Sequence, residues 1–157
     1  MNTVSNPTDL SLVITRTFDA PRERVYKAWT DPKQIQLWMG TDMGTKIPSA
    51  RADLRVGGKF RIQMQKPDGE FFTAVGEYRE IKPPERLVFT WDWEKDGSEP
   101  DFGEPEGNTT LMTLEFAARG KQTELTLKHE KFASRDSRDK HENGWNLCLN
   151  GLEKFLK

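Results

Sequence analysis

The C-terminal segment of the chain restricts the possible folds more than any other part of the sequence. Its apolar residues recur at steps of three and four, which draws one stripe along an amphipathic helix that begins between Ser134 and Asp139. Most of the preceding chain alternates between apolar and polar residues, as antiparallel strands do. The apolar face of such a sheet must be covered, so we expect the sheet to wrap around this helix. The stripe consists of His141, Trp145, Cys148, Leu149, Leu152, Phe155 and Leu156.

The alternating segments predict an antiparallel sheet of about seven strands. The strand expected at 86–93 is the most aromatic, because Leu87, Phe89, Trp91 and Trp93 share one of its faces. Gly, Pro and Asp residues punctuate the chain between these segments, as turns require. The other strands are expected at 10–18, 46–53, 59–65, 71–81, 109–118 and 122–130.

Two short helices are expected after the first strand. Asp19-Ala20-Pro21 offers a capping carboxylate and a proline suited to a first helical turn, and Asp31-Pro32 repeats that signal. The predicted fold class is therefore α+β, with a curved antiparallel sheet around a long C-terminal helix. Residues 1–9 are expected to form a frayed tail, and residues 10–157 a single domain.

Charge and composition argue against several classes of function. The chain has 24 Lys and Arg residues against 25 Asp and Glu, so it carries no global field that would attract nucleic acid. No apolar run is long enough to cross a bilayer, and the N-terminus lacks the pattern of a signal peptide. The single cysteine, Cys148, excludes an internal disulfide, so we expect a cytoplasmic protein.

The usual patterns of metal and cofactor sites are also missing. His129, His141 and Cys148 lack the close spacing of zinc ligands, so neither a metal nor a cofactor is expected. Gly57-Gly58 has no phosphate-loop pattern around it and is explained as a turn. The acidic stretch 94–108 has the spacing of neither a calcium loop nor paired catalytic carboxylates, so we expect a solvated loop there.

The inward faces of the predicted strands and of the last helix gather many aromatic rings. Several indoles facing one another are hard to close-pack, so they predict a pocket for an apolar guest between sheet and helix. The alternative is that the same side chains form an ordinary packed core, which needs no ligand. The predicted wall consists of Phe60, Ile62, Phe72, Tyr78, Phe89, Trp91, Trp93, Met112, Leu114, Leu127, His129, Trp145 and Leu149, with Trp38 and Met39 near the mouth.

A few polar residues fall on or near these inward faces. Arg16 could anchor an acidic head group or be paired structurally, and the structural role is favoured. His129 could act as a general acid or base, although a lone histidine on an apolar face is more often a hydrogen-bonded core residue. In an enzyme, His129, Tyr78 or Arg16 could orient a carbonyl substrate. Glu80 and His141 are of uncertain facing. Catalytic residues are therefore not assigned, with His129, Tyr78 and Arg16 as the candidates.

Four segments together resemble a known family. They are FDAP at 18–21, DLRVGGKF at 53–60, PPERLVFTW at 83–91 and GW at 144–145. They resemble the SRPBCC superfamily and, within it, the branch named after the C-terminal domain of the activator of the 90-kDa heat-shock protein ATPase. The resemblance covers nearly the whole chain from Leu10 onward. It implies a START-like or Bet v-like helix-grip fold with an elongated cavity between the sheet and the last helix.

The superfamily's range leaves several functions open, because one scaffold serves many activities. The leading hypothesis is the binding of a hydrophobic small molecule such as a lipid, a polyketide or an aromatic metabolite. One alternative is a cyclase, aromatase or hydrolase that uses the same cavity. The other is a chaperone-associated module of the stress response, which is weakened because co-chaperone relatives carry a second, N-terminal domain for which 157 residues leave no room. A homodimer is left open.

Overall fold

The computed structural model describes residues 10–94 and 108–157. The tail expected at 1–9 and most of the loop expected at 94–108 lie outside the described residues. The element order is β-α-α-β-β-β-β-β-β-α with one short 3-10 turn, as the resemblance implies. The elements are β1 (Leu12–Phe18), α1 (Arg22–Thr30), α2 (Pro32–Trp38), η2 (Thr41–Met43), β2 (Lys46–Ala52), β3 (Lys59–Gln65), β4 (Phe71–Lys82), β5 (Arg86–Glu94), β6 (Thr110–Arg119), β7 (Gln122–Glu130) and α3 (Arg135–Leu156).

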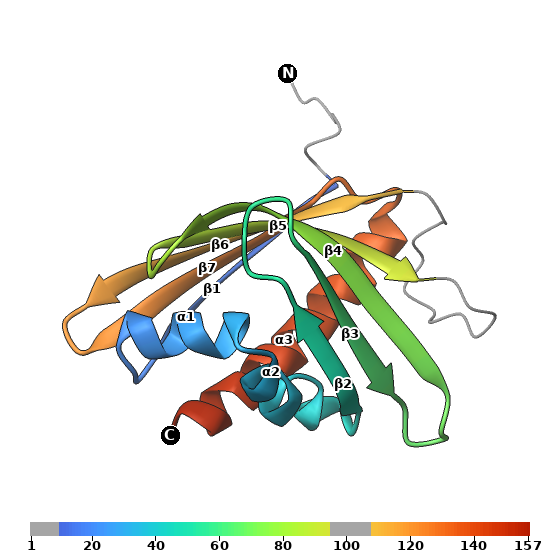
Figure 1. The fold of residues 1–157 in the computed structure, drawn as a ribbon, viewed down its shortest axis with the longest axis horizontal. Helices are drawn as coiled ribbons and strands as arrows, with labels where there is room; N and C mark the ends of the chain where they lie inside the picture. The colour runs from blue at the N-terminus through green and yellow to red at the C-terminus, as the bar shows by residue number, and fades with distance from the viewer. Residues whose placement is uncertain (1–9, 95–107) are drawn as a thin grey trace.

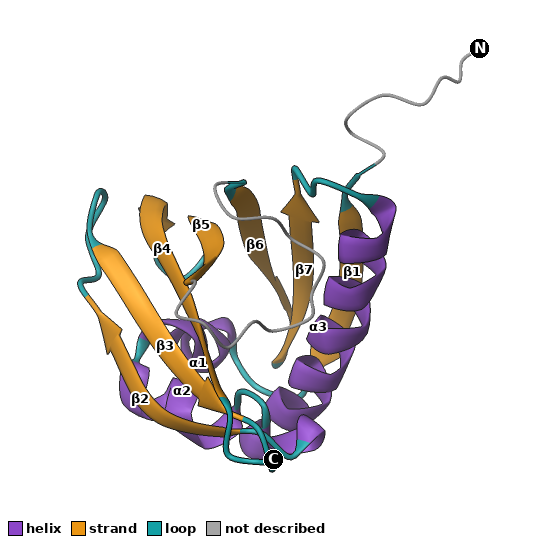
Figure 2. Cartoon of the chain, turned by 90° about the vertical axis from the view of Figure 1, so that its right-hand side faces the viewer, coloured by secondary structure: helices purple, strands orange, loops and turns teal. Residues whose placement is uncertain are grey.

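The strands form one antiparallel sheet in the order β1-β7-β6-β5-β4-β3-β2. The sheet arches over α3, and α1 and α2 lie below it at one end (Figure 1). Seen from the side, the two edges of the sheet curl toward the helices, which occupy its concave side (Figure 2). The predicted fold class is confirmed, and the strand bounds differ from the expected ones by two residues at most.

The starts of the helices follow the sequence signals only in part. Asp31 caps α2 as expected, because its carboxylate accepts a hydrogen bond from the Lys33 backbone N–H at 3.0 Å. The capping role expected for Asp19 is wrong: Pro21 occupies the cap position of α1, and no side chain caps that helix. Ser134 caps the long helix α3, because its hydroxyl accepts from the Ser137 N–H at 3.1 Å.

The curvature of the sheet depends on a close approach between β4 and β5. A Cβ atom on Gly76 would lie 2.0 Å from the Thr90 carbonyl oxygen and 2.5 Å from the Phe60 ring, so only glycine fits there. The pairing register of β4 and β5 shifts between Tyr78 and Glu80, a β-bulge that bends and twists a strand. The bend turns β2, β3 and β4 toward the helices and creates the concave interior.

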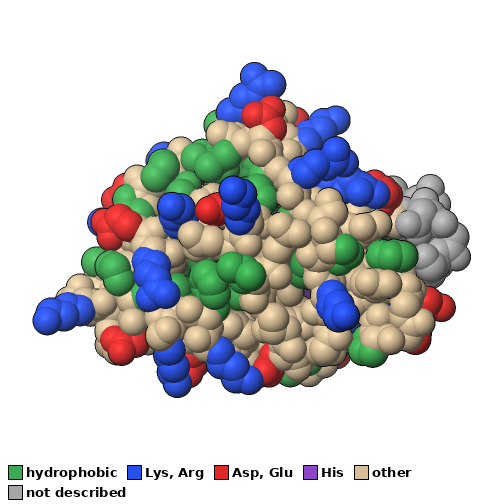
Figure 3. Space-filling model, turned by 60° about the horizontal axis from the view of Figure 1, so that its bottom comes forward, with side chains coloured by type: hydrophobic (Ala, Val, Ile, Leu, Met, Phe, Trp, Pro, Cys, Tyr) green, Lys and Arg blue, Asp and Glu red, His purple; other side chains and the backbone are tan. Residues whose placement is uncertain are grey.

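The outer surface mixes charges of both signs. Figure 3 shows basic side chains spread over one face, with acidic and apolar side chains between them. This agrees with the formal net charge of -1. Among the described residues, no helix has the length and apolar character needed to span a membrane.

Candidate ligand-binding site

The concave interior is packed with rings rather than open. Trp91 on β5 lies at the centre, with ring centroids 5.1 Å from Trp145, 5.5 Å from Trp93 and 6.0 Å from Phe60. These rings leave two small cavities of about 20 and 30 Å³, each with room for about one or two water molecules. The elongated cavity that the resemblance implies is therefore nearly filled, and neither small cavity admits a benzene-sized guest as it stands.

The first cavity, which we name the α2 cavity, has a volume of about 20 Å³. It lies between α2 and the strands β2 to β5. The Gln36 amide holds α2 to the edge strand by donating to the Ile47 carbonyl at 3.1 Å. Its walls are apolar except for Arg51, which is exposed, and Tyr78. The lining residues are Trp29, Pro32, Ile35, Met39, Ala50, Arg51, Ala52, Phe60, Ile62, Tyr78, Phe89 and Trp91.

The second cavity, which we name the α3 cavity, has a volume of about 30 Å³. It lies between α3 and the strands β3, β4 and β5. Burial raises the pKa of the Cys148 thiol to about 12, so on this wall the cysteine is a small apolar group and not a nucleophile. The lining residues are Met39, Met43, Met64, Phe72, Trp91, Trp93, His141, Gly144, Trp145 and Cys148.

The predicted wall residues divide into two groups. Those that line one of these cavities or both are Met39, Phe60, Ile62, Phe72, Tyr78, Phe89, Trp91, Trp93 and Trp145. The others are buried core residues that line neither: Trp38, Met112, Leu114, Leu127, His129 and Leu149. Sequence reasoning missed Trp29, Ile35 and Met64, although each lies on the apolar face of a predicted helix or strand.

Both ring nitrogens of His129 are engaged within the core. Its Nδ1 accepts from the Trp145 indole N–H at 3.0 Å, and its Nε2 lies 2.7 Å from the Thr110 hydroxyl. That hydroxyl donates to the Trp91 carbonyl at 2.7 Å, so it must accept the Nε2 proton. Burial, and then neighbouring His141, hold the pKa of His129 well below its usual value. The imidazole is therefore a neutral structural group in this arrangement.

A second histidine joins the helix to the sheet with the opposite tautomer. The Trp93 indole N–H donates to Nε2 of His141 at 2.9 Å, and Nδ1 of His141 lies 2.8 Å from the Ser137 carbonyl oxygen. Because Nε2 accepts, Nδ1 must carry the imidazole proton, and Nδ1–H donates a hydrogen bond to the Ser137 carbonyl. Two indole-to-imidazole hydrogen bonds thus fix α3 against β5 and β7.

The remaining polar candidates do not converge on either cavity. Arg16 donates to Oδ1 of Asn150 at 2.7 Å and to Oδ1 of Asn146 at 3.3 Å, so it ties β1 to α3. Glu80 forms ion pairs with Arg86 at 3.2 Å and with Lys82 at 3.4 Å. Burial raises the pKa of Tyr78 to about 12, which opposes a role as a base near neutral pH. Within the described ranges, no three His, Cys, Asp or Glu side chains gather into a metal-binding group.

Two of the indole donors have no acceptor. The N–H groups of Trp29 and Trp91 are buried, and neither finds a hydrogen-bond partner among the described residues. Both rings line the α2 cavity. The other three tryptophans all donate: Trp38 to the Ala28 carbonyl at 2.8 Å, and Trp93 and Trp145 to the two histidines. Buried donors are normally satisfied, so these two indoles are unusual, as are the buried hydroxyls of Tyr26 and Thr73, which also find no partner among the described residues.

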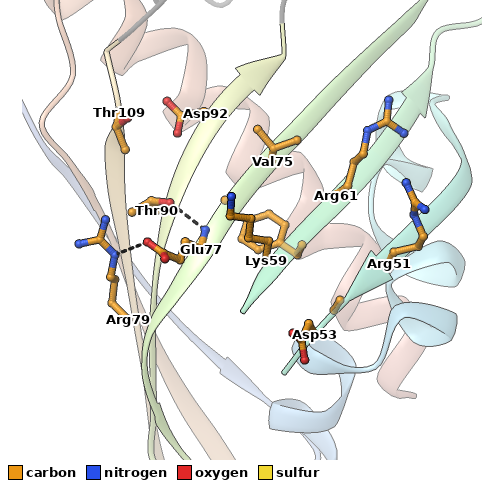
Figure 4. A pocket seen from close by; sticks show the side chains of 13 residues that line it. Arg51, Asp53, Lys59, Arg61, Val75, Glu77, Arg79, Thr90, Asp92 and Thr109 are labelled. Atoms are coloured by element: carbon orange, nitrogen blue, oxygen red, sulfur yellow. Dashed lines mark hydrogen bonds and ion pairs between the residues drawn. The ribbon is translucent and has the colours of Figure 1, made fainter. Parts of the chain in front are cut away.

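A larger groove of about 740 Å³ lies on the outer face of the sheet (Figure 4). Its labelled side chains include basic residues and acidic residues, and Arg79 pairs with Glu77 at 3.1 Å. Arg61 pairs with Glu94 at 2.9 Å. The groove presents charges of both signs, some of them already in ion pairs, and such a mixture does not select one class of ligand, so the interior remains the stronger candidate site.

Comparisons with known proteins agree with this architecture. A protein from Chromobacterium violaceum is 24% identical, with 94% of this chain and 97% of that chain covered and a TM-score of 0.78. The AHSA1 protein from Silicibacter pomeroyi is 24% identical, with 92% and 95% covered and a TM-score of 0.77. CalU16 from Micromonospora echinospora is 28% identical, with 94% and 76% covered and a TM-score of 0.70.

Among curated proteins, the search found no match. The family model described as activator of Hsp90 ATPase homolog 1-like protein matches residues 19–157, which include every element from α1 to α3. The chain therefore belongs to the family of activator of Hsp90 ATPase homolog 1-like proteins.

Proposed function

We propose that the protein binds an uncharged, largely apolar small molecule that carries a hydrogen-bond acceptor, and that the α2 cavity receives the acceptor. The observation that supports this most directly is the pair of buried indole N–H groups of Trp29 and Trp91, which have no acceptor within residues 10–94 and 108–157. A carbonyl or ether oxygen that reached one of these N–H groups would satisfy a donor that is otherwise costly to bury. The rings around them would supply the apolar contact.

The charge of the guest follows from what the interior contains. The buried polar residues of the described chain are threonines, one serine and two histidines, with no charged side chain among them. Burying a carboxylate or an ammonium without a charged partner is strongly unfavourable. Arg51 lines the α2 cavity, but it is exposed, so its charge remains in water. We therefore expect neutral ketones, esters or quinone-like rings rather than ionised fatty acids.

The enzyme alternative gains no support from the same residues. His129 uses both nitrogens in structural hydrogen bonds, and Arg16 is held by two asparagines of α3. A general base must reach the proton that it removes, and His129 lines neither cavity. Binding is thus the function that the geometry favours.

A matched set of small ligands tests the proposal by calorimetry. Acetophenone, ethylbenzene and benzoate have similar size, but only acetophenone is both neutral and an acceptor. We expect acetophenone to bind about tenfold more tightly than ethylbenzene, because satisfying a buried donor is worth about 1–3 kcal/mol. Benzoate is expected to bind the least. Equal affinities for all three, or no binding of any, would contradict the proposal.

The variant Trp91→Phe provides the control. It removes one indole donor and keeps an aromatic ring, so both neutral ligands meet the same altered cavity. We expect the preference for acetophenone over ethylbenzene to fall toward unity, whatever happens to the absolute affinities. A preference that survives in both Trp91→Phe and Trp29→Phe would show that the indoles are not the donors.

A further inference from the structure

We propose that the Met39 side chain is a movable wall between two chambers, and that it sets the size of the guest that the interior accepts. This inference rests on the proposed binding function. Met39 and Trp91 are the two residues that line both the α2 cavity and the α3 cavity. Each cavity holds little more than a water molecule, so a guest with even one ring needs the space of both cavities and that of the Met39 side chain between them.

Of these two residues, Trp91 is the fixed one. Its ring packs against Trp145, Trp93, Phe60 and Phe89, with centroid separations between 5.1 and 6.4 Å. Its carbonyl also accepts from the Thr110 hydroxyl at 2.7 Å, which ties this point of β5 to β6. Moving the indole would disturb all these contacts. The Trp91 ring is therefore a fixed part of the interior.

Met39 has the opposite character. It follows directly after α2, and its side chain has three rotatable bonds and a polarisable thioether, which adapts to irregular spaces. The residue is 2% exposed, so the side chain now fills interior space and not a surface site. A change of rotamer would join the two cavities without any break in secondary structure.

The backbone around Met39 is held in place, so that motion can stay within its side chain. The Met39 N–H donates to the Ile35 carbonyl at 3.0 Å. On the other side, α3 comes so close that a Cβ on Gly151 would lie 2.7 Å from the Trp38 carbonyl oxygen and 2.6 Å from the Thr41 hydroxyl oxygen. The hydrogen bond and the close approach of α3 hold the turn after α2 from two sides. The turn therefore keeps the Met39 thioether at the boundary between the two chambers.

The anchoring of η2 to α3 adds to this clamp. Asp42 pairs with Lys154 at 2.5 Å and accepts from the Asn150 amide at 3.2 Å. Lys154 and the Asn150 hydrogen bond also hold the pKa of the Asp42 carboxyl below its usual value. Neither Asp42 nor Lys154 lines either chamber. Their contacts restrain η2, the segment that follows Met39, and do not involve the Met39 side chain.

Met39→Ala and Met64→Ala form a matched pair for testing the wall. Both methionines are buried, at 2% and 3% exposure, but Met64 lines the α3 cavity and not the α2 cavity. Removing either side chain creates similar volume, and only the change at Met39 joins the chambers. We use benzene and the two-ring naphthalene as probes, with calorimetry and crystal structures of the soaked variants as readouts.

We expect Met39→Ala to bind naphthalene at least tenfold more tightly than Met64→Ala, with density that spans both chambers beside Trp91. Benzene is expected to discriminate less between the two variants, because it fits an enlarged single chamber. Equal naphthalene affinity in the two variants, or density confined to one chamber, would overturn the proposal.

Met39→Leu keeps the volume of the wall but has fewer rotatable bonds. It is expected to weaken binding of acetophenone relative to wild type, since a stiffer wall yields less easily. If Met39→Ala does not fold, Met39→Leu tests the proposed role of Met39 instead. Acetophenone affinity equal to that of wild type would then reject that role. The outcomes also separate the two proposals. If Met39→Ala binds naphthalene more tightly than Met64→Ala, but wild type does not prefer acetophenone over ethylbenzene, the Met39 wall is supported and the indole site is rejected. If wild type prefers acetophenone but the two variants bind naphthalene equally, the indole site is supported and the wall is rejected.

Discussion

Replacing Gly76 with alanine is expected to lower the free energy of unfolding by about 3 kcal/mol or more. The added Cβ would lie 2.0 Å from the Thr90 carbonyl oxygen, which belongs to the backbone of β5 and cannot move alone. The Phe60 ring, at 2.5 Å, would also have to shift. Urea denaturation of wild type and variant measures the effect. A loss this large is a substantial part of the 5–15 kcal/mol typical of a whole domain.

Gly69→Ala is the control for this prediction. Gly69 has a φ of +95° with open space around the position of a Cβ, so alanine there meets backbone strain but no clash. We expect a loss of about 1–2 kcal/mol at Gly69, clearly smaller than that at Gly76. If Gly76→Ala costs no more than Gly69→Ala, the close approach of β4 and β5 does not shape the sheet as we describe.

The stability of the protein is expected to fall as the pH drops below about 6.5, with His129 as a main cause. Burial and His141 hold the pKa of His129 well below its unfolded value, so below pH 6.5 the unfolded chain binds a proton that the folded chain does not. Acid therefore favours unfolding. The slope from this one group approaches about 1.4 kcal/mol per pH unit until the folded pKa is reached.

His129→Gln tests the source of that slope. A glutamine can present both an acceptor and a donor, as the neutral imidazole does for Trp145 and Thr110, but it does not titrate. We expect the variant to be less stable at pH 7 and to lose part of the pH dependence between pH 6.5 and 5, measured by denaturant unfolding at each pH. An unchanged slope would show that His129 is not the group responsible.

The spacing of apolar residues along the sequence was sufficient to predict the architecture. Alternation at 86–93 and a stripe at three- and four-residue steps after Ser134 correctly placed β5 and α3, because each period exposes one apolar face that has to be buried. The sequence signals for helix caps predicted the structure less well. Asp19 and Asp31 precede prolines in similar contexts, yet only Asp31 caps its helix.

The details of the interior could not be predicted from the sequence, because they depend on distances between residues that are far apart in the chain. Alternation places Trp91 and Trp93 on one face of β5. It gives no sign that the Trp93 indole donates to His141, or that the Trp91 N–H meets no acceptor in the part of the chain that the structure describes. It also cannot show that Met39 separates two small cavities. The size of a void is the difference between large packed volumes, so it follows only from the completed fold.

The five tryptophan indole N–H groups allow the most direct test of the proposed site. Each gives its own signal in a ¹⁵N–¹H spectrum, assigned with single Trp→Phe variants, and acetophenone is then titrated into the labelled protein. We predict that the signals of Trp29 and Trp91 move downfield in a saturable way, because they gain an acceptor. The signals of Trp38, Trp93 and Trp145, which already have acceptors, should move much less. Five stationary signals, or shifts confined to the three donors that are already bonded, would contradict the account.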